Sequence, residues 1–167
     1  MPRRLLRDQL SVADEWLYLD EVAADLQRPG TAPSPVIVPF DRWLAERESW
    51  MSRGDRLGVR LDPADPVEPL AADLPRLALV ALRFPGAAEG RGYTQARLLR
   101  ERWGFAGELR ATGYVHLDQL FFLARCGVNA FELPEGEFAS AERALQTFSA
   151  EYQVSNDAGL AQPLRRR

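Results

Sequence analysis

Short apolar runs alternate with amphipathic runs along most of this chain, which is typical of strands that are each followed by a helix. The run "PVIVPF" (residues 35–40) predicts a strand. The run "DRWLAERESWM" after it predicts a helix with Trp43 and Trp50 on one apolar face. The same alternation predicts further strands at residues 56–61, 76–84, 107–113 and 128–134.

Helix signals follow each of these strands. In "DPADPVEPLAADL" we expect Asp65 to be the N-cap, Pro66 the first helical residue and Glu68 the partner that completes a capping box. Residues 94–103 predict the next helix, and "VHLDQLFFLARCG" predicts another that ends at Gly127. The last helix carries one apolar stripe, made of Ala141, Ala144, Leu145 and Phe148.

About five consecutive βα units predict an α/β fold with a parallel sheet, because each helix must pack back on the sheet through a right-handed crossover. We expect an incomplete (βα)-barrel-like sheet; the alternative is an open, doubly wound, three-layer sheet. Residues 1–35 are expected to hold an edge strand at 16–19 and a Pro/Gly linker. Residues 36–152 would form the single α/β domain, and 153–167 a flexible tail.

Ligands of parallel α/β folds bind at the carboxyl ends of the strands, and the loop "EGRGYTQ" (residues 89–95) follows the third of them. Gly90 and Gly92 would let the backbone bend tightly, and the following helix would direct its free N–H groups toward the loop. An anion site is therefore one hypothesis, with these residues: Arg83, Gly90, Arg91, Gly92, Thr94, Arg97 and Arg110. The alternative is a plain turn whose arginines pair with nearby glutamates.

The sequence offers no clear catalytic group. His116 and Asp118 could form a base and its orienting carboxylate, but a polar pair in the first turn of a helix more often caps that helix. Cys126, the only cysteine, lies at the end of an apolar helix, which is typical of a buried and inert thiol. We predict no metal site and no cofactor in this chain.

Charge and composition narrow the classes of partner. All 21 basic residues are arginine, so a P-loop lysine and a Schiff-base lysine are excluded, and the formal net charge of −3 argues against general nucleic-acid binding. No run approaches the roughly 18 apolar residues of a membrane span. We therefore expect a cytoplasmic protein that contacts neither nucleic acid nor membrane.

Five segments of the chain resemble a known bacterial family: "VIVPFDRW", "GVRLDPADPVEPLAADLPRLALVALRFP", "GRGYTQARLLRER", "GELRATG" and "DQLFFLARCG". The family is a domain of unknown function encoded beside the genes of assimilatory sulfite reductase and phosphoadenylylsulfate reductase. The resemblance covers residues 36–133 and implies a role in sulfite reduction during cysteine biosynthesis, associated with an oxidoreductase. Residues that match the family pattern are Arg91, Arg97, Arg100, Arg110, Asp118 and Gln119.

Two positions depart from that pattern. Glu89 stands where the family usually has Asp, and Tyr114 stands where it has Asp within a Gly-Asp-Val motif. A catalytic role for either carboxylate is therefore not supported in this chain.

Two functions follow as hypotheses. The first is an accessory protein that binds sulfite reductase or its electron donor; the second is a protein or enzyme that binds a sulfur oxyanion or a phosphosulfate nucleotide at residues 89–95. An open patch formed by Trp16, Tyr18, Trp43, Trp50 and Tyr93 would favour the first. A deep pocket lined by Arg83, Arg91 and Arg110 would favour the second. A separate expectation concerns the oligomeric state: because an incomplete barrel has open edges, a homodimer is plausible.

Overall fold

The computed structural model describes residues 4–54 and 56–147 of the chain. Its centre is one eight-stranded sheet in the order β2-β1-β8-β7-β6-β5-β4-β3. The strands are β1 (Arg4–Arg7), β2 (Leu10–Ala13), β3 (Leu17–Tyr18), β4 (Val36–Pro39), β5 (Leu57–Leu61), β6 (Leu79–Phe84), β7 (Glu108–Gly113) and β8 (Ala130–Phe131). The α/β class expected from the sequence is confirmed.

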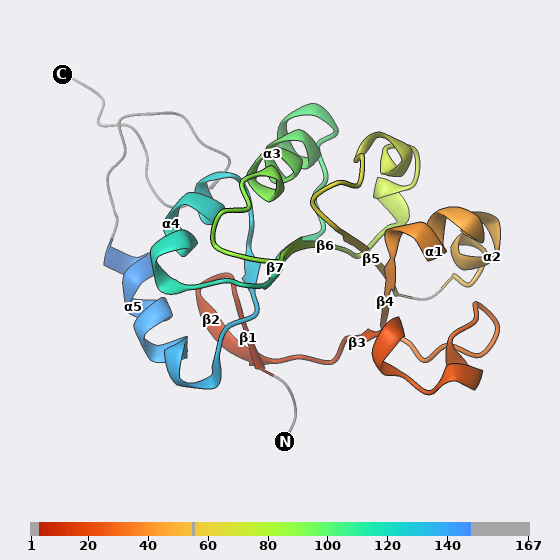
Figure 1. The fold of residues 1–167 in the computed structure, drawn as a ribbon, viewed down its shortest axis with the longest axis horizontal. Helices are drawn as coiled ribbons and strands as arrows, with labels where there is room; N and C mark the ends of the chain where they lie inside the picture. Colours follow the sequence, from red (N-terminus) through yellow and green to blue (C-terminus); the bar gives the residue numbers. More distant parts are fainter. Residues whose placement is uncertain (1–3, 55, 148–167) are drawn as a thin grey trace.

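Strands β3 to β8 run parallel and lie side by side in chain order. With right-handed crossovers, sequential order places every connection on the same face of the sheet. Figure 1 shows the helices in an arc around the outside of the strands. They are α1 (Phe40–Ala45), α2 (Arg47–Met51), α3 (Arg91–Arg97), α4 (Leu117–Arg125) and α5 (Phe138–Thr147). A doubly wound sheet would require the strand order to reverse, so that alternative is wrong.

The sheet is mixed, which corrects the expectation of purely parallel strands. The hairpin β1–β2 joins the parallel part through β1, which pairs antiparallel with β8. Its turn residues Asp8 and Gln9 both have positive φ, as a type I′ hairpin turn requires. Helix α5 covers the outer edge of β2, where Glu142 accepts a hydrogen bond from the backbone N–H of Ser11 at 2.9 Å.

The two ends of the sheet lie close to each other. Only residues 14–16 connect Ala13, the last residue of β2, to Leu17, the first of β3. This connection spans at most about 14 Å, although β2 and β3 are the opposite edges of the sheet. The sheet therefore curls into a half-barrel, and the β2–β3 connection crosses its open side.

Alternate residues of the strands point to two different interiors. The larger core lies between the sheet and the helices and includes Val59, Leu82 and the fully buried Trp43. A second apolar cluster fills part of the half-barrel itself, with these members: Trp16, Tyr18, Ile37, Leu79 and Ala81. The rest of that interior is polar and is described below.

Two sequence predictions need correction in detail. Residues 65–74 form no α-helix; the segment contains only the 3₁₀ turns η3 (Glu68–Leu70) and η4 (Leu74–Arg76), because its prolines lack the N–H groups that an α-helix uses. Asp65 does not cap a helix but accepts the backbone N–H of Asp62 at 2.7 Å. The third helix begins three residues earlier than expected and ends in the π-helical turn η5 (Leu98–Arg102).

The edge strand expected at 16–19 is present as β3, but the N-terminal segment also supplies β1 and β2. Residues 4–19 thus share the sheet of the α/β domain. The tail predicted at 153–167 and Phe148 of the last apolar stripe lie outside the described residues.

A substitution at Gly127 tests whether this residue ends α4 as predicted. Its φ is +96°, and an added Cβ would lie 2.4 Å from Cγ of Arg100, so Gly127→Ala should lower the free energy of unfolding by about 2–4 kcal/mol. Gly104→Ala is the control, because Gly104 also has positive φ but has no atom within 4 Å of an added Cβ. It should cost only about 1–2 kcal/mol. Equal losses in urea unfolding would show that contact with Arg100 is unimportant.

Candidate functional site

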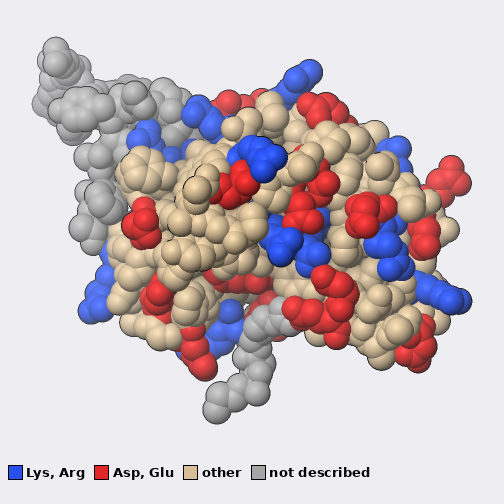
Figure 2. Space-filling model, in the orientation of Figure 1, with Lys and Arg blue, Asp and Glu red and all other residues tan. Residues whose placement is uncertain are grey.

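The carboxyl ends of the parallel strands form a rim on which opposite charges are paired. Arg83, at the end of β6, donates to Asp62 at 3.0 Å, and Arg60 of β5 donates to Asp20 at 3.0 Å. Figure 2 shows acidic and basic side chains interleaved over the face of the molecule in view. The charges of Arg60 and Arg83 on the rim are each paired with a carboxylate.

The loop at residues 89–95 already contains an anion, the carboxylate of Glu89. This carboxylate accepts the backbone N–H of Arg91 at 2.9 Å, and the Arg91 guanidinium binds both of its oxygens, at 3.0 and 2.9 Å. The hydrogen bonds from Arg91 hold the pKa of Glu89 below its ordinary value. The first N–H of α3 and the arginine fork are thus bound to the chain's own carboxylate.

The two glycines of this loop have different roles. Gly90 precedes α3 with a φ of −97°, and nothing lies within 4 Å of an added Cβ. At Gly92 an added Cβ would lie 2.4 Å from Cζ of Phe84. Gly92 is therefore required for close packing of α3 on β6, and a positive φ is not the reason for it.

The other predicted anion ligands do not join Arg91. Arg97 pairs with Glu101 one turn along the helix, at 3.1 Å, and Thr94 lies exposed on α3. Arg83 pairs with Asp62, and Arg110 is completely buried inside the half-barrel. The structure thus gives each of the four arginines a different carboxylate partner.

Arg110 lies at the centre of a buried ion cluster. Its guanidinium binds both oxygens of Asp14 at 3.0 Å, one oxygen of Glu108 at 2.8 Å and one oxygen of Glu132 at 3.1 Å. The side chains of Arg110 and Asp14 are both 0% exposed. Arg7 extends the cluster outward by binding the second oxygen of Glu108 at 3.3 Å.

Two neutral side chains complete the coordination of Glu132. The hydroxyl of Tyr18 donates to one oxygen at 2.5 Å, and the hydroxyl of Thr112 donates to the other at 2.7 Å. Burial and the charge of Glu132 raise the pKa of Tyr18 far above its ordinary value, so its hydroxyl stays protonated and donates at neutral pH. Burial lowers the pKa of Arg110, but the carboxylates of Glu108 and Asp14 outweigh it and raise that pKa overall.

The arrangement favours a structural role for this cluster. Each oxygen of Glu132 and of Asp14 accepts at least one hydrogen bond from the cluster, and Tyr18 keeps its proton. The cluster joins the β2–β3 connection, which carries Asp14, to β7 and to the end of β8. It therefore holds the curled sheet closed.

His116 does not pair with Asp118. The carboxylate nearest to its ring is that of Glu137, 3.4 Å from Nδ1, and its ring packs against Tyr114 with centroids 4.4 Å apart. Its backbone N–H donates to Gln119 at 2.9 Å, which is a capping contact at the start of α4. The proposed catalytic pairing of His116 with Asp118 thus gains no geometric support, and it stays a hypothesis.

Arg100, one of the residues that match the family pattern, binds backbone carbonyl groups. It donates to the carbonyls of Phe105, of Gly107 at 2.9 Å and of Gly127 at 2.9 Å. Burial lowers the pKa of Arg100. These bonds tie the end of the third helix to the start of β7 and to the end of α4.

Most of the ion cluster was not predicted from the sequence, although one signal was present. In β7 the polar residues Glu108, Arg110 and Thr112 alternate with Leu109 and Ala111. Such alternation in a strand predicts that its two faces differ, with one face polar. Nothing in the local sequence indicated that Asp14, 96 residues away, would supply one of the three carboxylate partners of Arg110.

Two kinds of feature are missing from the described ranges, 4–54 and 56–147. They contain no group of three or more His, Cys, Asp or Glu side chains arranged to hold a metal ion. None of the helices within them has the length and apolar character needed to cross a bilayer.

The fold and rim define an α/β half-barrel protein with an ion-paired interior. A model of the family described as "Bacterial protein of unknown function (DUF934)" matches residues 58–163. The chain belongs to this family. No curated protein matches it.

The structural role of the cluster can be tested with Arg110→Met. This substitution leaves three carboxylates near one another without their shared cation, so the free energy of unfolding should fall by about 3–5 kcal/mol. Arg83→Met is the control: it removes an exposed ion pair with Asp62 and should cost less than about 1 kcal/mol. Both are measured by urea unfolding followed by circular dichroism. Similar losses in the two variants would contradict the structural role.

Proposed function

We propose that this protein is an accessory protein of assimilatory sulfite reduction in cysteine biosynthesis, acting by binding sulfite reductase or its electron donor. The family resemblance described above supports the metabolic assignment. In this proposal the electron-transfer groups belong to the partner, and this chain supplies a binding surface.

One observation favours protein binding over capture of an oxyanion at the rim. Arg83, Arg91 and Arg97 each bind a carboxylate of the same chain. An incoming sulfite or sulfate would have to displace that carboxylate, and its binding free energy would be reduced by the bonds lost. A partner protein needs no such exchange.

The segment that begins at the end of β7 and continues through α4 is the surface best suited to a protein partner. The side chain of Tyr114 is 44% exposed and that of Phe122 is 58% exposed, which is unusual for large rings. Aromatic side chains contribute strongly to protein interfaces because they bury a large area with few rotatable bonds. The five aromatic residues first considered form no open patch, since Trp16, Tyr18, Trp43 and Trp50 are buried.

The proposal predicts co-elution of the purified chain with the cognate sulfite reductase, or a higher turnover of that enzyme with its natural donor. Tyr114→Ser and Phe122→Ser should weaken the interaction by roughly tenfold or more, as expected for interface aromatics. Leu44→Ser is the matched control, because Leu44 is 48% exposed but lies on α1, far from α4 in Figure 1. Absence of binding at tens of micromolar, with no change in rate, would contradict the accessory role.

A second candidate function is favoured by the geometry of the Glu89 carboxylate. The backbone N–H and the guanidinium of Arg91 bind this carboxylate as they would bind a sulfur oxyanion or the acidic group of a phosphosulfate nucleotide. We propose as the alternative that such a ligand binds here by replacing Glu89.

If this alternative holds, Glu89→Gln should tighten the binding of sulfite and sulfate roughly tenfold, because a neutral amide competes less well for the guanidinium. Adding Arg91→Ala should abolish the gain. Titration calorimetry at low salt measures both effects. Identical affinities of the wild type and Glu89→Gln, or no saturable binding by either, would exclude the alternative.

A further inference from the structure

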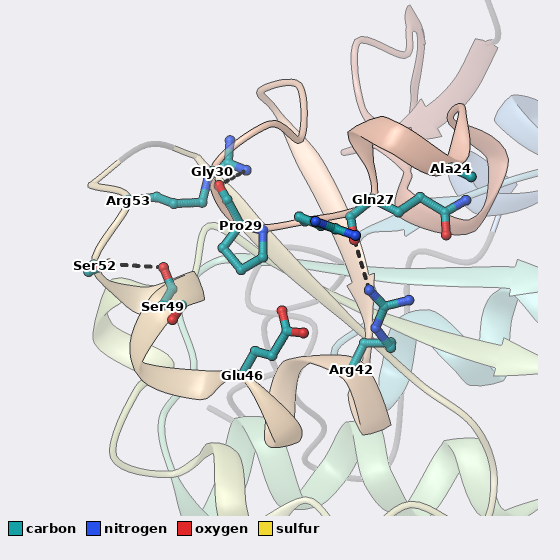
Figure 3. A pocket seen from close by; sticks show the side chains of 10 residues that line it. Ala24, Gln27, Pro29, Gly30, Arg42, Glu46, Ser49, Ser52 and Arg53 are labelled. Carbon is teal, nitrogen blue, oxygen red and sulfur yellow. Dashed lines mark hydrogen bonds between the residues drawn. The ribbon is translucent and has the colours of Figure 1, made fainter.

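A pocket of about 590 Å³ lies outside the half-barrel, between the N-terminal linker and the helices α1 and α2. Figure 3 shows residues of the linker, including Gln27 and Pro29, facing side chains that project from the helices. This volume is in the range of small-molecule sites. The pocket lies before residue 58, where the family match begins.

The lining of this pocket is basic. It contains Arg28, Arg42 and Arg53, against a single carboxylate, that of Glu46. Arg42 donates to the carbonyl of Gln27 at 2.8 Å. Arg53 donates to the carbonyl of Pro29 at 3.1 Å. These bonds fix the walls of the pocket by tying the linker to the helices.

Arg42 differs from the arginines of the rim in the partner that it binds. Arg83, Arg91 and Arg97 bind carboxylates, whereas the bond from Arg42 goes to a neutral carbonyl oxygen, and within residues 4–54 and 56–147 no carboxylate forms an ion pair with Arg42. Arg28, from the linker, is exposed and lines the same pocket. Two cations on facing walls favour an anionic group between them.

The helical wall of the pocket, which carries Arg42, also offers a carboxylate and hydroxyls. In Figure 3, Glu46 points from the helices toward the linker and lies between Ser49 and Arg42. A carboxylate and a hydroxyl there suit a hydroxyl or amino group of a ligand. An inorganic anion alone would fill only a small part of the volume.

We propose that this pocket binds a small organic anion, with its phosphate or carboxylate held by Arg28 and Arg42 and a hydroxyl or amino group directed to Glu46. The site is separate from the rim and does not depend on the proposed accessory role. Phosphate esters and carboxylates share this recognition chemistry, and the choice of probes distinguishes them.

The test is titration calorimetry of the full chain at low salt with glycerol 3-phosphate, adenosine 5′-monophosphate and succinate. At least one probe should bind saturably, and Arg28→Gln and Arg42→Gln should each weaken it roughly tenfold, the usual effect of losing one charge-assisted hydrogen bond. Glu46→Gln should tighten binding of the acidic group by a few fold, because it removes the nearest like charge.

Arg91→Ala is the matched control, since it removes an arginine of the rim and leaves the pocket intact. Arg28→Gln guards against loss of structure, because it breaks none of the bonds that tie the linker to the helices; thermal unfolding checks each variant. Absence of saturable binding below about 10 mM, weaker than any useful affinity, would overturn the proposal. So would binding that is insensitive to Arg28→Gln and Arg42→Gln, or that is lost with Arg91→Ala.

Discussion

The curl of the sheet and the burial of Arg110 depend on each other. A guanidinium without water needs anionic partners on several sides, and here they come from different segments: Asp14 from the β2–β3 connection, Glu108 from β7 itself and Glu132 from the end of β8. In a flat sheet, β2 and β3 would lie at opposite edges, and the connection could not be as short as three residues. Closure brings Asp14 to Arg110, and the ion pair in turn holds the closure.

The chain contains no lysine, so arginine must supply the cations of these ion pairs. A guanidinium presents five donors in a planar fork and can bind two or three partners at once, whereas an ammonium acts as a point charge. Arg110 uses its fork to join three carboxylates, and Arg100 uses the same geometry to join three backbone carbonyls. Arginine therefore serves here chiefly to crosslink segments, and a high arginine content alone does not indicate an anion site.

Local periodicity was sufficient to predict strands β4 to β7 and the helix α4, because each has a regular apolar face. The hairpin β1–β2 was missed because its two strands lack the continuous apolar run of β4, and β1 gains its contacts from β8 and α5, far along the chain. The position of the 89–95 loop on the rim followed from the βα pattern. The return of Glu89 onto Arg91 did not, since it depends on side-chain conformation within the loop.

The β2–β3 connection also shows that the interior of the half-barrel needs residues from the N-terminal segment. The family match starts at residue 58, within β5, whereas Asp14, Trp16 and Tyr18 enter the half-barrel from the N-terminal segment. A fragment that starts at residue 58 would lose Asp14, one of the three carboxylate partners of Arg110, and the side chains of Trp16 and Tyr18 from the apolar cluster of the half-barrel. The segment that the family model matches is thus smaller than the segment whose side chains build the interior of the half-barrel.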